Sequence, residues 1–267
     1  MRTKLKNVQT IVIKVGTNTL THSNGKMNLK SMEKLVREIS ELSNEGKKVI
    51  LVTSGAVGVG LGKLNLAKKP KTLAARQVLA SVGQCELMHI YSKLFSEYGI
   101  TVGQILLTRD VTENPAKAEN AYNTFKGLLD MGIVPIVNEN DAISTDQLAI
   151  VDTFGDNDTL SAMVAKLVEA DLLIILSNID GLYDKDPNQN QDARIIETVT
   201  DVDDEIQSYA SDLISSLGKG GMKTKLSAAK TCMENNIIMA IINGQNMKNI
   251  SRLIDGENIG TLFMKKK

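Results

Sequence analysis

Short apolar runs alternate with longer amphipathic segments along this chain. The runs occupy residues 10–16, 47–55, 100–108, 132–140, 171–178 and 236–244, and a shorter one lies at 261–264. Each is nearly continuous in apolar, often β-branched residues, which is typical of parallel strands covered on both faces. The pattern therefore predicts six buried strands and a shorter last strand.

The segments between these runs have the periodicity of helices. In residues 28–46, apolar side chains recur every three or four positions and share one face, with Asn28 suited to cap the start and Gly46 to end the helix. These side chains are Met32, Leu35, Val36, Ile39 and Leu42. Further helices are predicted at 72–97, 117–131, 157–169 and 223–235.

Regular alternation of strands and helices predicts an α/β fold with a mainly parallel central sheet between layers of helices. The 267 residues fit one large α/β domain or two small ones. The most polar stretch, residues 180–200, is predicted to be a loop. We find no internal repeat and no Gly/Ser-rich linker.

Composition excludes several classes of protein. Lys plus Arg equals Asp plus Glu, at 31 each, so the sequence has no electrostatic signature of nucleic-acid or anionic-membrane binding. The two cysteines, Cys85 and Cys232, form no disulfide or zinc pattern, which suits a reducing cytoplasm. No run approaches the roughly 18 apolar residues of a membrane span. His22 and His89 stand alone and indicate no catalytic triad.

Polar residues gather where the predicted strands end. Open parallel sheets bind ligands beyond the carboxyl ends of their strands. Five strands end in polar or glycine-containing groups, so we expect a polar cleft along one edge of the sheet. These groups are 14–17, 53–55, 138–141, 177–181 and 243–244.

Lys14 interrupts the apolar run IVIKVG. It could be an edge-strand lysine whose ammonium group reaches water along its aliphatic stem. It could also be a phosphate-binding ammonium held by a rigid strand, with Gly16 allowing the backbone to approach a ligand closely. We favour the second interpretation.

Two glycine-rich segments suggest anion binding. Residues 53–62 (TSGAVGVGLG) read as a turn between a strand and a helix, where free amides suit a phosphate or carboxylate, although a purely conformational turn is the alternative. Residues 218–225 (GKGGMKTK) resemble a Walker A loop but have Met222 before Lys223 and Thr224, so a P-loop is disfavoured. We interpret this segment as a phosphate clamp leading into a helix.

Asp156, Asn157 and Asp158 precede an apolar-periodic helix. They could cap the helix and interact with its dipole. They could also organise Mg²⁺–phosphate or nearby lysines, and the two roles are compatible.

Taken in order, these motifs resemble the amino acid kinase family, and within it the members that phosphorylate glutamate. The resemblance runs from Thr10 to Phe263. Its motifs are IVIKVGTNTL, VILVTSGAVGVG, YGITVGQILLT, IVPIVNENDAI, FGDNDTLSA, SNIDGLYDKDP and LGKGGMKTKL. The start KVGT differs from the KFGGTS of aspartokinases and the KxGG of acetylglutamate kinases.

The resemblance implies a three-layer αβα sandwich and a reaction. ATP, with Mg²⁺, would phosphorylate the γ-carboxylate of L-glutamate in the first step of proline biosynthesis. An amino-acid-binding lobe would span about residues 1–170 and an ATP-binding lobe about 171–267. Many members also carry a C-terminal PUA domain; this chain stops just after its last predicted strand, so we expect none.

Residue roles follow from the same motifs. Lys14 and Lys225 would stabilise the transferring phosphoryl group, and Asp158 would orient them. Glutamate would be bound by Ser54, Gly55, Asp141 and Asn157. ATP would be bound by Lys14, Ser177, Asn178, Lys219, Gly220, Gly221, Met222, Lys223, Thr224 and Lys225. Ser177-Asn178 replaces the Thr-Asp common in the family, which leaves the detail of that nucleotide contact open.

The resemblance also implies ligands and an oligomeric state, and it leaves alternative functions open. Glutamate and ATP are the expected ligands, proline is a candidate feedback inhibitor, and a homo-oligomer is expected. One alternative is a related kinase that acts on another carboxylate, a carbamate or a nucleoside monophosphate. Another is a non-catalytic ATP-sensing protein on the same fold, which would be expected to lack one of the two lysines. An NAD-dependent oxidoreductase is disfavoured by the glycine spacing.

Overall fold

The computed structural model describes residues 2–22, 26–66, 68, 70–108, 110–143, 157–212 and 221–265. The chain divides into two compact units. The first combines Met1–Lys14 with Asp156–Lys267, and the second is Val15–Gly155. Lys14, near the N-terminus, therefore folds with the C-terminal part of the chain.

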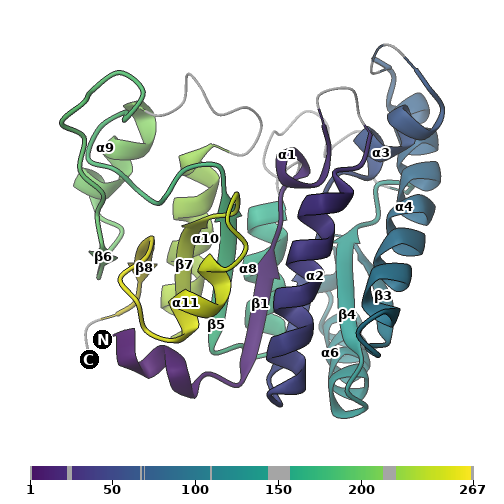
Figure 1. Cartoon of the computed structure of the whole chain (residues 1–267), viewed down its shortest axis with the longest axis horizontal. Coiled ribbons are helices and arrows are strands. Elements are labelled where there is room, and N and C mark those ends of the chain that lie inside the picture. The colour runs from purple at the N-terminus through teal and green to yellow at the C-terminus, as the bar shows by residue number, and fades with distance from the viewer. Residues whose placement is uncertain are drawn as a thin grey trace. The chain divides into compact units, whose positions relative to one another are not determined.

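The first unit contains a mainly parallel sheet (Figure 1). Strands β1, β5 and β7 run parallel, β8 pairs antiparallel with β7, and β6 pairs parallel with β8. In sheet order the strands are β1 (Thr10–Lys14), β5 (Leu172–Ser177), β7 (Ile238–Asn243), β8 (Thr261–Phe263) and β6 (Thr198–Val199). All six residues of β5 are buried, as expected of a strand covered on both faces.

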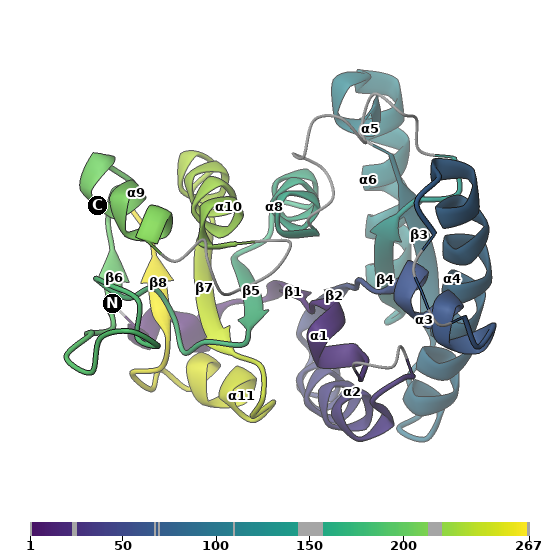
Figure 2. The same ribbon diagram turned by 90° about the horizontal axis from the view of Figure 1, so that it is seen from above.

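Helices cover both sides of these strands. Figure 2 shows α8 and α10 on one side of β5 and β7, with α11 on the other. The helices of this unit are η1 (Arg2–Asn7), α8 (Asn157–Leu167), α9 (Asp204–Asp212), α10 (Met222–Glu234) and α11 (Asn249–Ile254).

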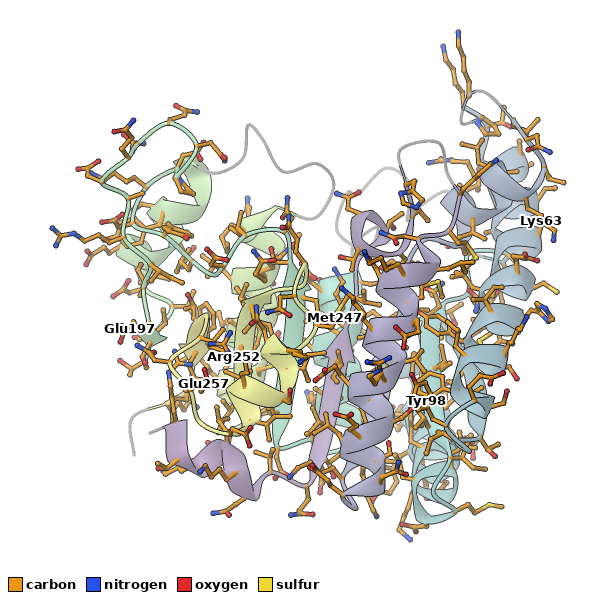
Figure 3. The ribbon with its side chains drawn as sticks, viewed as in Figure 1. Lys63, Tyr98, Glu197, Met247, Arg252 and Glu257 are labelled. Atoms are coloured by element: carbon orange, nitrogen blue, oxygen red, sulfur yellow. The ribbon has the colours of Figure 1, made fainter. Side chains whose placement is uncertain are left out.

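Arg2 joins the N-terminal helix η1 to the C-terminal part of the same unit. Its guanidinium group donates hydrogen bonds to the backbone carbonyls of Glu197, Glu257, Ile259 and Gly260, at 2.7–3.3 Å. Glu197 and Glu257 are labelled in Figure 3, where Glu257 lies beside Arg252, its ion-pair partner at 2.7 Å. These contacts hold the two ends of the unit together.

The second unit has a parallel sheet in the order β3 (Val102–Leu107), β4 (Val134–Glu139), β2 (Lys48–Val52). Figure 2 shows α2 and α6 on opposite sides of these strands. Asn28 caps α2 through Ser31 N, and Gly46 follows its end with φ +85°, as the sequence predicts. The helices are α1 (Thr17–Leu20), α2 (Leu29–Asn44), α3 (Ala56–Lys63), α4 (Leu73–Ser96), α5 (Asp110–Glu113) and α6 (Pro115–Asp130).

The glycine-rich segment 53–62 is mostly helix rather than turn, which corrects our interpretation of it. Helix α3 begins at Ala56, so only residues 53–55 form the connection. A Cβ on Gly60 would lie 2.0 Å from the Leu79 carbonyl oxygen, and one on Gly83 would lie 1.7 Å from that of Ala56. These two glycines therefore allow α3 and α4 to pack closely.

The predicted fold class is confirmed: every predicted strand and every long predicted helix is present in the described residues, in mainly parallel sheets with helices on both sides. The loop predicted at 180–200 is wrong at its end, where Thr198–Val199 form β6. The helices we did not predict have at most nine residues, too few for periodicity to identify. Among the described residues, no helix is both long and apolar enough to cross a bilayer.

Glu169 provides a test of backbone strain in this fold. It follows α8 with φ +51°, a left-handed conformation that costs an L-residue roughly 1–2 kcal/mol. Glycine adopts it freely, although its greater freedom in the unfolded chain offsets part of the gain. We expect Glu169→Gly to raise the thermal unfolding midpoint by roughly 1–3 °C.

Asn236 supplies the matched control. It follows α10 with φ +59°, but asparagine tolerates this region better than glutamate. Asn236→Gly should therefore change the midpoint by less than Glu169→Gly. Equal shifts in the two variants, or a lower midpoint in Glu169→Gly, would show that strain at Glu169 is not relieved in this way.

Candidate active site

A buried carboxylate between two buried lysines is the centre of the first unit. Asp158 Oδ1 lies 2.6 Å from Lys14 Nζ, and Asp158 Oδ2 lies 3.0 Å from Lys225 Nζ. Asp158 is fully buried, and the two lysines are 6% and 8% exposed. The structure thus brings together the three residues predicted to be catalytic.

Three elements position this cluster. Lys14 is the last residue of β1, at the carboxyl edge of the parallel strands. Asp158 is in the first turn of α8 and Lys225 is in the first turn of α10. Because both helices begin beside the same strand edge, their first turns can present charged side chains where β1 ends.

The electrostatics of the cluster favour the charged form of Asp158. Burial, the largest single influence, would raise the pKa of this carboxyl group. The charges of Lys14 and Lys225, together with their hydrogen bonds, outweigh burial and lower the pKa of Asp158 below its usual range. Asp158 is therefore an ionised carboxylate that both lysines contact, and their ammonium groups are of the charge that would attract an anionic ligand.

Asp158 is the second residue of α8, so it lies inside the helix rather than in the position before it, and its carboxylate contacts residues outside the helix. Thr224 Oγ1 donates to Asp158 Oδ2 at 3.0 Å, in addition to the two lysines. Asn157, half-buried, is the first residue of α8. Asp156 lies outside the described residues.

The predicted phosphate clamp is described only in part. Gly221 precedes α10, Met222 is buried, Lys223 is exposed and Thr224 is half-buried. Lys219 and Gly220 lie outside the described residues. The described portion therefore shows a helix start beside Asp158, with one exposed and one buried lysine in its first turn.

The ends of β5 and β7 form a polar edge in the same unit. Ser177 is buried at the end of β5, and Asn178, which follows it, is exposed. Asn243 at the end of β7 donates through Nδ2 to Asp180 Oδ1 at 2.8 Å. Since β1, β5 and β7 are parallel, these residues and Lys14 lie at the same edge, as predicted.

In the second unit, the connection after β2 carries Ser54 and Gly55. Gly55 has φ +98°, a conformation that favours glycine, and immediately precedes α3. Thr53 is fully buried, and its Oγ1 lies 3.0 Å from the hydroxyl oxygen of Tyr91 on α4. The backbone beside Ser54 is thus held by a buried hydrogen bond.

The end of β4 carries further polar residues of the second unit. Asn138 is buried, and Glu139 and Asp141 are half-buried. Burial, followed by the negative charge of Asp141, raises the pKa of Glu139 to about 7. The negative charge of Asp141 therefore disfavours the charged form of Glu139, and a cationic group of a ligand would suit this pair of carboxyl groups.

Sequence reasoning missed the residues that support these strand ends. Gln84 and Tyr91 lie within an apolar helical segment, and nothing in their spacing marks them as partners of Asn138 and Thr53. Glu139 is part of the motif NEND, but its perturbed pKa follows from burial, which periodicity does not reveal. The available signal was that Gln84 and Tyr91 are polar groups seven positions apart in an apolar helix, which places them on one face but does not identify their partners.

A groove of about 650 Å³ in the first unit lies away from this chemistry. It is lined by residues at the amino ends of the strands, among them Val8, Asp171 and Ile238. Asp171 Oδ2 already accepts hydrogen bonds from the backbone amides of Gln9 and Thr10, at 2.8 and 2.9 Å. Since catalytic sites of open parallel sheets lie at the opposite edge, we assign no function to this groove.

Comparison with known proteins identifies the class to which this fold and cluster belong. The family model described as the amino acid kinase family matches residues 9–243, so the chain belongs to that family. The glutamate 5-kinases of Clostridium perfringens and Listeria monocytogenes (strain HCC23) are each 54% identical to it over all 267 residues. These matches cover 99% and 97% of the two relatives' own lengths.

Solved structures agree on the fold. The UMP kinase of Bacillus anthracis superposes with a TM-score of 0.64 over 97% of this chain and 96% of its own, at 16% identity. The UMP kinase of Ureaplasma parvum gives a TM-score of 0.65 over 97% of this chain and 99% of its own, also at 16% identity. At this identity the likeness shows the fold alone.

Glu139 gives a test of the site's electrostatics. Its pKa is raised from 4.5 to about 7 on folding, so the folded state binds a proton that the unfolded state has already released. Stability contributed by the neutral form is complete below pH 4.5 and is lost as the pH rises to about 7. We expect Glu139→Gln to unfold at a higher temperature than the unsubstituted protein at pH 8.

At pH 4 the two proteins should unfold at nearly the same temperature, because Glu139 is then neutral in both states. Glu139 is partly exposed, so solvent screening reduces the effect at pH 8 to about 1 kcal/mol, or roughly 2–4 °C. Thermal unfolding followed by circular dichroism without ligand measures the difference. A difference that is the same at both pH values would exclude a raised pKa of Glu139.

Proposed function

We propose that this chain transfers the γ-phosphoryl group of ATP to the γ-carboxylate of L-glutamate, giving L-glutamyl 5-phosphate and ADP. The observation that carries the proposal is the buried cluster of Lys14, Asp158 and Lys225. The curated relatives named above, matched over the whole chain, support glutamate as the acceptor. The reaction is then the first step of proline biosynthesis.

This acceptor explains why the cluster contains no general base. A glutamate side chain has a pKa near ~4.3 and is already ionised at neutral pH. Its carboxylate oxygen attacks the γ-phosphorus, the bond between that phosphorus and the β,γ-bridging oxygen breaks, and ADP leaves with the electron pair. The difficulty is electrostatic, because an anion must approach a triphosphate.

The two lysines address that difficulty. Lys14 and Lys225 would contact the phosphoryl oxygens as charge develops on them, and Asp158 would hold both ammonium groups in place. A buried position suits this role, because charge–charge interactions are stronger where water is excluded. Asp158 would thus be a positioning residue rather than a base.

Substrate contacts are proposed from the motifs and their placement. Ser54, Gly55, Asp141 and Asn157 would bind glutamate, with Asp141 accepting hydrogen bonds from the α-ammonium group. Ser177, Asn178 and the segment Lys219–Lys225 would bind ATP, with Lys14 at its γ-phosphate.

Mg²⁺ is proposed to enter the site together with ATP. In the part of the chain that the structure describes, no three acidic, histidine or cysteine side chains are grouped as metal ligands. The oxygens of Asp158 are directed to Lys14, Lys225 and Thr224. MgATP is therefore the proposed co-substrate.

The alternatives differ in what they require of the cluster. A non-catalytic ATP-sensing protein would not need both lysines buried on one carboxylate, and both are present. A kinase acting on another carboxylate or on a nucleoside monophosphate could use the same cluster. The relatives favour glutamate over these acceptors.

A coupled assay of ADP release tests the acceptor directly. The panel contains L-glutamate, L-aspartate, N-acetyl-L-glutamate, carbamate and UMP, each with and without Mg²⁺. We expect release with L-glutamate in the presence of Mg²⁺, trapped as the hydroxamate when hydroxylamine is added. Release with another acceptor and none with glutamate would overturn the proposal.

Proline is a proposed inhibitor, because it shares the α-carboxylate and α-nitrogen of glutamate. We propose that proline competes with glutamate for the amino-acid site of this chain. Inhibition by proline in the same assay should then be relieved by raising the glutamate concentration. Inhibition that glutamate does not relieve would place proline elsewhere.

The lysines give the sharpest prediction about mechanism. Lys14→Ala and Lys225→Ala should each lower kcat by roughly 100-fold or more, the scale of losing one contact to transition-state charge. Lys230→Ala is the matched control, since Lys230 is an exposed lysine on the same helix as Lys225. Steady-state kinetics in which either of the first two variants turns over like the control would remove that lysine from the mechanism.

A further inference from the structure

We propose that Gln84 is a positioning residue for the amino-acid substrate, acting through Asn138. The inference rests on the proposed function, since it concerns the end of β4 that carries Asp141. Gln84 lies on α4 and Asn138 near the end of β4, and both side chains are buried. Asn138 Nδ2 donates to Gln84 Oε1 at 2.8 Å.

The backbone amide of Glu139 determines which way the side-chain amides of Asn138 and Gln84 are oriented. The backbone amide of Glu139 donates to Asn138 Oδ1 at 2.9 Å, and an amide N–H can only donate. The oxygen of Asn138 must therefore face Glu139, and its nitrogen must face Gln84. It follows that Gln84 presents its oxygen to Asn138, so one peptide group orients two side-chain amides.

The hydrogen bonding of Gln84 does not look optimised for stability. Its Nε2 is buried and has no hydrogen-bond partner in the described part of the chain. A buried donor without an acceptor lowers stability, so an apolar pair of similar shape would suit a purely structural contact better. What the amide provides is an acceptor that fixes the orientation of Asn138.

The segment fixed in this way leads directly to the proposed substrate contact. Asn138 lies three residues before Asp141, and the backbone amide of Asn140 donates to the Leu107 carbonyl at 2.8 Å. With Asn138 and Asn140 both held, little freedom remains in the backbone that presents Asp141. A change at Gln84 would reach Asp141 through Asn138.

Helix α4 supports the other strand end in the same manner. Tyr91 is seven residues after Gln84, so the two side chains lie on the same face of the helix. The Tyr91 hydroxyl oxygen lies 3.0 Å from Thr53 Oγ1, next to Ser54. One helix face thus holds the two connections that carry Ser54 and Asp141.

The test is a double-mutant cycle on glutamate KM. Gln84→Met keeps the length of the side chain and removes the acceptor, and Asn138→Leu removes its partner. We expect Gln84→Met to raise glutamate KM about tenfold, with kcat and ATP KM within about twofold of the unsubstituted enzyme. In the Asn138→Leu background, Gln84→Met should have no further effect, because it acts through Asn138.

Two further variants separate positioning from loss of fold. Gln84→Glu retains an acceptor oxygen and should keep glutamate KM within about threefold of the original value. Tyr98→Phe removes the hydrogen bond from Tyr98 to Glu33 (2.8 Å), just beyond the end of α4 (Figure 3). Tyr98 lies near the starts of β3 and β4, at the opposite edge of the strands from Asp141, so this variant should leave KM unchanged. Thermal unfolding of each variant shows whether KM merely follows stability.

Hydrogen exchange at the Glu139 amide gives a readout that needs no substrate. Gln84→Met should lower its protection, and Gln84→Glu should restore it. Unchanged protection and KM in Gln84→Met, or KM effects of Gln84→Met and Asn138→Leu that simply add, would overturn the inference. Absence of glutamate turnover in the unsubstituted enzyme would instead overturn the proposed function, while the exchange result would still decide the role of Gln84 in holding Asn138.

Discussion

The structure depends on one buried carboxylate, Asp158, that forms ion pairs with two buried lysines. Removing each ion from water costs several kcal/mol. The attraction of Asp158 to Lys14 and to Lys225 offsets part of that cost. Removal of either lysine leaves one ion pair with Asp158, whereas removal of the carboxylate takes the same ion-pair partner from both buried lysines. The cluster thus holds two ammonium groups at the carboxyl edge of β1, where an anionic ligand could contact them.

The fold supplies that arrangement through parallel strands. Because β1, β5 and β7 run in the same direction, their polar ends lie at one edge, and α8 and α10 begin beside it. The chain brings Lys14 there from its N-terminal part, more than 140 residues from Asp158 in sequence. In the second unit, the face of α4 that carries Gln84 and Tyr91 holds the ends of β4 and β2.

The buried strands and the position of Lys14 were predictable because their sequence signals are local. Continuous apolar runs identify buried strands, and a lysine within such a run, as Lys14 is in IVIKVG, is conspicuous. Short helices and the two-residue strand β6 escaped prediction, since they span too few residues to show a period. The glycine-rich segment was misread as a turn because a helix packed closely on another helix can need glycine too, as α3 does at Gly60. The supporting role of Gln84 depends on contacts 54 residues apart, which no spacing rule reveals.

The most direct test of this account is the turnover of Asp158→Asn. The substitution keeps both lysines and nearly the same shape, and it removes only the charge that they share. Breaking a buried ion pair in this way costs about 3–5 kcal/mol, so the variant should unfold at a lower temperature and should be assayed below that midpoint. If the carboxylate positions the lysines, kcat with L-glutamate and MgATP should fall by about 100-fold or more in the folded variant. A kcat within about threefold of the unsubstituted enzyme would contradict the account.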